Sequence, residues 1–451
     1  MNRVAALVFV IAGCAPTTGE LRSGVDALVE KRLGDTPRRG AVHELLAKPL
    51  DRSAAIKIAI ANNARLAAAF DELGIAGGEL GSALGLGPVE LHGSMRLGAH
   101  REYELDVIQN VLGLVTAPRR RAAAKADIEA ARANAAGATL QLAARVDVAF
   151  TNLLAAQTDL ASRRTQFDAA DAAALLRERM FAAGNTTVLA QARDRDAREQ
   201  ARIAVARAEA TVELRRESLN ALLGLAGDDT KWTATGTLGA LPANAPSIDS
   251  LEGDAVAASL ELAAGRARRD AAENHAADVR LRTVLPELGV GVSIHGDDEH
   301  GVGVGPLVAI AIPLFDWKSG ERAKANAAID RAAHLLAADA VELRANARSA
   351  RITALAAYQE ARHVTDIVIP LRSQILDETL KHYNAMDADP FALLLARREL
   401  ADAEAQQVDA LRRFWNAMSA VTALQRGVSL EMSNEPSTET RTPARGHSSN
   451  H

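Results

Sequence analysis

The sequence of 451 residues is poor in cysteine, in aromatic side chains and in long apolar runs. Its single cysteine, Cys14, excludes a disulfide bond within the chain. Only 3% of the residues are aromatic although 48% are hydrophobic, and this mixture, dominated by Ala and Leu, is typical of long helices in coiled-coil contact. After Ala12 no apolar stretch is long enough for a transmembrane helix. The net charge of -5 is spread along the chain, which gives no basic face for nucleic acid.

The signatures of common enzymes are also absent. The sequence has no Walker A lysine loop, no Gly-x-Ser-x-Gly and no His-Glu-x-x-His. One turn concentrates possible metal ligands: His295, Asp297, Asp298, Glu299 and His300. A charged turn that stays solvated explains the same residues, so we expect no catalytic residue, no cofactor and no resident metal.

The first residues have the pattern of a bacterial secretory signal. Asn2-Arg3 precedes an apolar run over 4–12, and the quartet Ile11-Ala12-Gly13-Cys14 resembles the lipobox of lipoproteins, whose cysteine is acylated. We therefore expect a signal peptide over residues 1–13, a lipid on Cys14, and an extended arm over residues 14–50 that reaches the lipid. An ordinary signal peptide with a chance cysteine is the alternative.

Two copies of one plan follow, over residues 51–226 and 247–425. Each contains a helix, two strands, a very long helix, a tight turn and a further helix. Leu219-Asn220-Ala221-Leu222 closes the first copy and Trp415-Asn416-Ala417-Met418 closes the second. A linker over residues 227–246 connects the copies and is expected to lie against their waist. The tail over residues 426–451 is expected to be disordered.

The long helices carry heptad seams. Residues 119–183 contain no proline, and a helix of roughly 60 residues there would measure about 90 Å. Apolar residues follow it at alternating spacings of four and three: Leu142, Val146, Ala149, Leu153, Ala156 and Leu160. The second long helix, over 318–384, has the same rhythm at Leu343, Ala347, Ala350, Ala354 and Ala357. We expect a first helix over 51–80 and a return helix over 187–225.

Each copy also contains a predicted β-hairpin. Residues 288–294 and 302–314 alternate around a polar turn, and residues 89–97 and 103–115 form a weaker version of the same pattern. A sheet of four strands has two open edges and cannot span lipid alone. Three chains would supply twelve strands, enough to close a barrel, so the topology favours a trimer.

Residues 306–316 have the sequence Pro-Leu-Val-Ala-Ile-Ala-Ile-Pro-Leu-Phe-Asp and are followed by Ser319-Gly320. This segment resembles the strand-to-helix junction of the TolC family of outer-membrane efflux proteins. The start of the same hairpin, the first helix with Asn62-Asn63, and the two helix-hairpin tips are similar as well: 285–288, 58–73, 181–193 and 383–397. The resemblance covers residues 50–425, although the first copy has Thr-Ala-Pro-Arg-Arg-Arg at 116–121 in place of the junction motif.

The resemblance implies a mostly α-helical protomer of long antiparallel coiled-coil helices and four strands. Three such protomers would form a twelve-stranded barrel in the outer membrane, continued by a helical tunnel in the periplasm. It implies a lipid-anchored homotrimer that acts as the passive exit duct of a tripartite efflux or secretion system, together with a periplasmic adaptor protein and an inner-membrane pump. Heavy-metal cations, drugs and polypeptides remain alternative cargoes. The alternative function is a periplasmic coiled-coil adaptor or structural protein of such an assembly.

The resemblance also points to functional residues at the two tips. The adaptor-contacting positions correspond to Ala183, Gly184 and Asn185 in one tip and to Ala385, Met386 and Asp387 in the other. The aspartates that narrow some family pores would fall at Ala392 and Leu395, so that gate is absent here. Candidates for a different gate are Asp387, Asp389 and Tyr383. For Asp389, capping of the helix that begins at Pro390 is the alternative.

Overall fold

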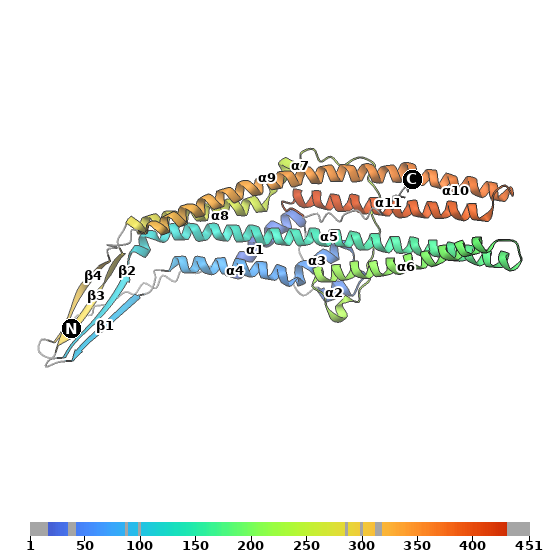
Figure 1. The fold of residues 1–451 in the computed structure, drawn as a ribbon. Coiled ribbons are helices and arrows are strands. Elements are labelled where there is room, and N and C mark those ends of the chain that lie inside the picture. The colour runs from blue at the N-terminus through green and yellow to red at the C-terminus, as the bar shows by residue number, and fades with distance from the viewer. Residues whose placement is uncertain are drawn as a thin grey trace, which may run out of the picture.

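The computed structural model describes residues 17–34, 42–85, 89–97, 101–284, 287–297, 301–311 and 318–430. The molecule is elongated, with a β-sheet at one end and two helical hairpin tips at the other (Figure 1). No helix among the described residues is both long enough and apolar enough to cross a membrane. The predicted signal peptide and the proposed lipid site at Cys14 lie outside the described residues, as does the tail beyond Leu430.

The two halves of the chain contain the same order of elements. The first half has two short helices, a hairpin of strands, a very long helix and a return helix: α3 (Arg52–Asn62), α4 (Ala64–Leu84), β1 (Val89–Leu97), β2 (Arg101–Asn110), α5 (Leu112–Ala182) and α6 (Val188–Leu223). The second half follows the same order: α7 (Leu251–Ala258), α8 (Leu260–Val284), β3 (Glu287–Asp297), β4 (Gly301–Ala311), α9 (Ser319–His363), α10 (Ile369–Asn384) and α11 (Pro390–Gln425). A π-helical turn, Val364–Val368, joins α9 to α10.

Helix α5 runs along the middle of the molecule. Toward the sheet it packs between α4 and α8, and toward the tips it packs between α6 and α11 (Figure 1). The predicted seams are buried: Val146 and Leu153 of α5 and Ala354 of α9 have no exposed surface. Alanine predominates on the seam of α9, which lets the helix axes approach closely.

The strand predicted over 103–115 ends earlier than expected. Strand β2 stops at Asn110, whose side-chain oxygen accepts a hydrogen bond from the backbone N–H of Leu112 at 3.0 Å. Residues 112–115 are therefore the first turn of α5, and Pro118 lies inside that helix. A short apolar run has no period that separates strand from helix, and here the hydrogen bond from Leu112 to the Asn110 side chain marks where the strand ends.

The first helix, predicted as one segment over 51–80, is two helices joined at Asn63. The side-chain oxygen of Asn63 accepts from the N–H of Leu66 and begins α4, while its Nδ2 donates to the carbonyl oxygen of Leu222 at 2.9 Å. Nδ2 of Asn62 donates to the carbonyl oxygen of Gly224 at 2.7 Å. The two asparagines therefore satisfy carbonyl groups at the end of α6 that have no partner within the helix.

The arm expected to be extended over 14–50 contains helices. Helix α1 (Thr18–Leu33) begins with a capping box, in which the side chains of Thr17 and Glu20 each accept from the other's backbone N–H. A second short helix is α2 (Val42–Leu46). Apolar residues four apart on α1 are buried where it packs on α4 and α5: Leu21, Val25 and Val29. The expectation of an extended arm was wrong, because apolar residues four apart form a stripe along one side of a helix, and α4 and α5 cover this stripe.

The linker lies across both halves near the middle of the molecule. Nε1 of Trp232 donates to Oδ1 of Asn220 at 2.8 Å, and Nε1 of Trp415 donates to the carbonyl oxygen of Gly239 at 2.8 Å. The hydroxyl of Tyr358 donates to the carbonyl oxygen of Pro242 at 3.2 Å. The hydrogen-bond donors of these three aromatic side chains thus hold the linker against the helices of both halves.

Candidate functional site

The β-sheet has an apolar face that is exposed. Its strands are antiparallel in the order β1-β2-β3-β4, so β2 and β3 join the two halves and β1 and β4 are edges. Alternate residues on one face are between 40% and 69% exposed: Val89, Leu91, Met95, Tyr103, Leu105, Val290, Val292, Val302, Val304, Val308 and Ile310. A sheet facing water on one side normally buries its apolar face and exposes its polar one. Here the apolar face is exposed as well as the polar one, which indicates an apolar environment around this end of the molecule.

The other face of the sheet is polar near its turns. Across β1 and β2, His92 lies opposite Asp106 and Ser94 lies opposite Glu104. Across β2 and β3, Glu104 lies opposite His295. Of the turn that raised the possibility of a metal site, residues 298–300 lie outside the described residues, and no three described His, Cys, Asp or Glu side chains are arranged to hold an ion.

The two helix-hairpin tips have the same backbone turn. In the first tip the N–H of Asn185 donates to the carbonyl oxygen of Met180, and Gly184 has a φ of 75°. In the second the N–H of Asp387 donates to the carbonyl oxygen of His382, and Met386 has a φ of 62°. Both are the left-handed turns that often end helices and favour glycine. Met386 adopts this conformation with a side chain that is 95% exposed.

The candidate gate residues have local partners in the second tip. Asp389 caps α11, because its Oδ1 accepts from the backbone N–H of Phe391 and of Ala392. Oδ2 of Asp387 lies 2.8 Å from Nδ1 of His382. Tyr383 is partly exposed at 38%. The remaining candidate positions, Ala183 and Ala385, follow the last residues of α5 and α10.

Arg177 connects the two hairpins, a role that the sequence did not indicate. Its Nε lies 2.5 Å from Oδ2 of Asp194 on α6, and its Nη1 donates to Oγ1 of Thr186 at 3.1 Å. The guanidinium also lies 3.1 Å from the centre of the Phe391 ring on α11. Side-chain exposure is 15% for Arg177 and 21% for Asp194, so this contact is shielded far better than an ordinary surface ion pair. No local pattern marks Arg177, because its partners come from two other helices.

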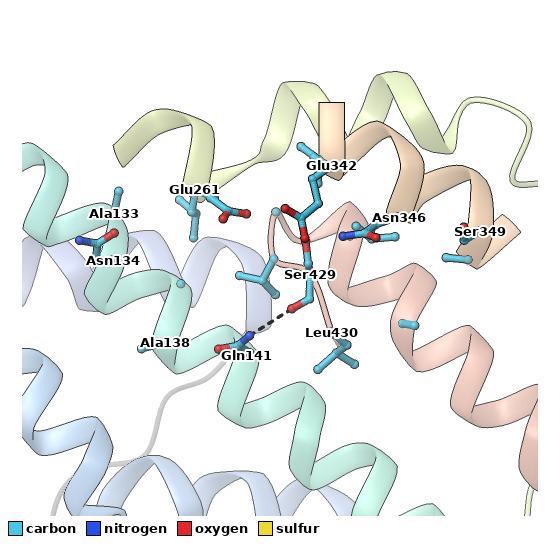
Figure 2. A pocket seen from close by; sticks show the side chains of 18 of the residues that line it. Ala133, Asn134, Ala138, Gln141, Glu261, Glu342, Asn346, Ser349, Ser429 and Leu430 are labelled. Atoms are coloured by element: carbon cyan, nitrogen blue, oxygen red, sulfur yellow. Dashed lines mark hydrogen bonds between the residues drawn. The ribbon is translucent and has the colours of Figure 1, made fainter. Parts of the chain in front are cut away.

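A cavity of about 750 Å³ lies where α8 and α11 meet beside α5 and α9 (Figure 2). The chain beyond α11 crosses it, and Nε2 of Gln141 donates to the carbonyl oxygen of Ser429 at 3.2 Å. Glu261 lines one wall, and burial raises its pKa, with further contributions from the charges of Asp339 and Glu342. Arg268 also lines the cavity and opposes this shift. The cavity belongs to the joint between the halves.

A sheet with an exposed apolar face is extended in this chain by a wall of long helices with paired tips, and known proteins share this architecture. No family model matches the sequence. The cobalt-zinc-cadmium resistance protein CzcC of Cupriavidus metallidurans is 26% identical over 379 residues, which are 83% of this chain and 90% of that protein. Among solved structures, the outer membrane protein VceC of Vibrio cholerae has a TM-score of 0.69 at 15% identity, over 84% of this chain and 96% of VceC. The open MtrE outer membrane channel of Neisseria gonorrhoeae has a TM-score of 0.57 at 19% identity, over 83% of this chain and 89% of MtrE.

The chain has the fold of the TolC family of outer-membrane channel proteins. This confirms the fold that the resemblance implied, whereas residues 312–316 of the junction motif lie outside the described residues.

Proposed function

We propose that this chain is the outer-membrane exit duct of a tripartite efflux system, through which substrate passes passively from the periplasm to the exterior. The observation that carries the proposal is the exposed apolar face of the sheet. Strands β1 to β4 contain 9 to 11 residues, which is the length that crosses the hydrocarbon layer when strands are tilted. The sheet would therefore lie in the outer membrane, and the helices would extend into the periplasm.

Three copies would form the complete duct. The outer sides of β1 and β4 have no partner strand among the described residues, and an unpaired edge cannot remain open in lipid. Exposed apolar side chains also lie on the outermost helices of the wall, on α6 at one margin and on α9, the π-helical turn and α10 at the other: Ile203, Leu214, Val341, Ile352, Ile367 and Leu371. We propose that one margin packs against the other margin of the next copy, so that twelve strands and the helices close together.

The tips would contact a periplasmic adaptor, which in turn engages an inner-membrane pump. In support, Met386 combines a left-handed backbone with a fully presented apolar side chain, and backbone strain of this kind persists where function requires it. Gly184 provides the same turn without a side chain. Asp387, Asp389 and Tyr383 stay candidates for a gate at the same end, where threefold repetition would bring the copies together.

Two further assignments complete the proposal. Cys14 would carry the lipid that anchors the mature chain to the membrane. The cargo that we propose first is heavy-metal cations, because the curated relative CzcC is named for cobalt, zinc and cadmium resistance. The chain itself would catalyse nothing.

The native mass of the detergent-extracted protein tests the duct first. We expect a trimer, and we expect the same trimer to conduct ions across a planar lipid bilayer. Ile352→Asp places a charge on the proposed margin and should yield monomers, whereas Ile352→Ala should retain the trimer. A monomeric, non-conducting wild type would refute the duct in favour of a coiled-coil adaptor or structural protein. Acyl labelling that persists in Cys14→Ala would refute the lipid assignment.

A further inference from the structure

We propose that a basic segment of α5 next to the sheet binds the headgroups of anionic phospholipids in the periplasmic leaflet of the outer membrane. Its exposed basic residues are Arg119, Arg121 and Lys125. Residues 116–121, Thr-Ala-Pro-Arg-Arg-Arg, stand in place of the junction motif of the other half, and the duct gives them no role. The inference rests on the proposed function, because a sheet that lies in the outer membrane brings this segment to the membrane surface.

The first turns of α5 continue the exposed apolar surface of the sheet. Strand β2 ends at Asn110 and α5 begins at Leu112, at the sheet end of the molecule (Figure 1). Leu114 and Val115 are 51% and 55% exposed. At a rise of about 1.5 Å per residue, Arg119 lies about 6 Å along the helix beyond Val115. The headgroup layer on each side of the hydrocarbon is about 5–8 Å thick, so the first arginine follows the apolar residues at the spacing of that layer.

The basic and apolar side chains share one side of the helix. Leu114, Arg121 and Lys125 follow one another at spacings of seven and four residues, which places them on one face, and all three are exposed. Val115 and Arg119, four residues apart, are likewise neighbours on the exposed surface. The residues that α5 buries here lie on another side: Leu112, Thr116, Ala117 and Ala124. The environment that meets the apolar residues therefore meets the cations as well.

The arginine side chains lean toward the sheet. In an α-helix each Cα–Cβ bond tilts toward the N-terminus, and the N-terminus of α5 is its sheet end. Arg120 shows this direction, because its Nη2 donates to the carbonyl oxygen of Gly113 at 2.8 Å, seven residues back along the chain. The same lean carries Arg119 and Arg121 toward the apolar band. An arginine stem can then cover apolar surface while its charge stays at the polar boundary.

The three cations have no counter-ion among the described residues. Residues 112–126 contain four basic residues and no acidic one. Arg132, further along the same helix, pairs with Glu129 at 2.6 Å, whereas no ion pair or hydrogen bond within the described part of the chain engages the side chains of the three. Guanidinium groups bind phosphate oxygens in a bidentate manner. Unpaired cations beside exposed apolar side chains fit a ligand that is anionic at one end and apolar at the other, and an anionic phospholipid has this chemistry.

The second half presents a smaller version of the same arrangement. Helix α9 also begins at the sheet end, and Arg322 and Lys324 are exposed in its first two turns. Val308 and Ile310 of β4 are 61% and 57% exposed. Glu321 offsets part of the basic charge, so α5 provides the stronger surface. In a trimer both sets would repeat three times around the membrane boundary.

The test is a titration of the detergent-extracted protein with phosphatidylglycerol, in which native mass spectrometry counts the bound lipids. Phosphatidylcholine with the same acyl chains is the comparison without net charge. A basic residue near an anionic surface contributes roughly a factor of five in binding, so three of them predict a preference of roughly 100-fold for phosphatidylglycerol. The double variant Arg119→Gln, Arg121→Gln should lose roughly 25-fold of this preference.

Two further double variants serve as controls. Arg65→Gln, Arg145→Gln removes two exposed arginines of α4 and α5, and Arg145 lies about 36 Å along α5 from Arg121. This variant should bind phosphatidylglycerol as wild type does. Arg119→Lys, Arg121→Lys retains the charges without the planar guanidinium and should lose less than about fivefold.

The outcomes separate this inference from the duct itself. A wild type that binds both lipids equally would refute it, and so would an unchanged preference in Arg119→Gln, Arg121→Gln, because the arginines would then lie away from lipid. An equal loss in Arg65→Gln, Arg145→Gln would show that net charge alone is responsible. Displacement of phosphatidylglycerol by excess inorganic phosphate would replace the lipid surface with a site for free phosphate.

Conductance is measured separately, in bilayers of phosphatidylcholine. A conducting trimer without the predicted lipid preference would overturn the lipid surface and leave the duct in place. A monomeric, non-conducting wild type would refute the duct and the inference with it. A conducting trimer whose preference falls only in Arg119→Gln, Arg121→Gln supports both.

Discussion

The link through Arg177 should control the local stability of the helix-hairpin tips. Its shielded ion pair with Asp194 is a charge-assisted contact worth about 1.5–3 kcal/mol. The stacking of the guanidinium on Phe391 adds about 0.5–1 kcal/mol. Arg177→Ala removes both and leaves the carboxylate of Asp194 partly buried. We therefore expect the free energy of local opening at the tips to fall by about 2–4 kcal/mol.

Hydrogen-deuterium exchange of the detergent-extracted protein measures this opening directly. Because about 1.4 kcal/mol corresponds to a factor of ten, exchange in residues 170–200 and 385–400 should accelerate by roughly 30-fold to 1000-fold. Exchange near the sheet should not change. Phe391→Leu retains the ion pair and should produce only the smaller part of the effect.

Arg164→Ala provides the matched control on the same two helices. Arg164 pairs with Glu209 at 2.8 Å, but the two side chains are 60% and 50% exposed. Such a solvated pair contributes at most about 1 kcal/mol, so exchange should change by roughly fivefold or less. An Arg177→Ala variant that exchanges no faster than Arg164→Ala would show that the tips are held together without this link.

Three further predictions concern single positions. Met386→Gly relieves the strain of a left-handed backbone and should slow hydrogen exchange at its tip, corresponding to stabilisation by up to about 1 kcal/mol. The same variant should bind the adaptor more weakly in a pull-down. Unchanged adaptor binding would remove Met386 from the contact. Gly427 has a φ of 88°, and a Cβ there would collide with the carbonyl oxygen of Ala258. Gly427→Ala should therefore lower the free energy of unfolding by at least about 2 kcal/mol. A melting temperature equal to that of wild type would contradict this. Burial, with nearby carboxylates, raises the pKa of Glu261 in the folded chain, so its protonation favours folding and its contribution to stability should rise as the pH falls through that raised pKa. Glu261→Gln should match or exceed wild-type thermal stability at pH 7 and lose that gain on acidification; an identical pH profile in both proteins would be the contrary result.

Local patterns in the sequence determined much of this fold. The seams of α5 and α9 were predictable because a heptad rhythm of Leu, Val and Ala buries the same stripe whichever helix covers it. Strand β1 was predicted with its observed bounds. The capping role of Asp389 was predictable as one of two alternatives, since a cap depends only on residues next to one another in the chain.

Other features depend on contacts between distant segments. The conversion of the predicted arm into α1 needs the surface of α4 and α5, and the break at Asn63 needs the end of α6. Arg177 gains its role only when the two hairpins lie side by side. The pairing of Glu104 with His295 joins strands from different halves of the chain. By itself the sequence determined the periodicity of each helix and strand, because periodicity is set by neighbours along the chain. Only the tertiary structure decided which charged groups meet, because their separation in space is set by how the two halves pack.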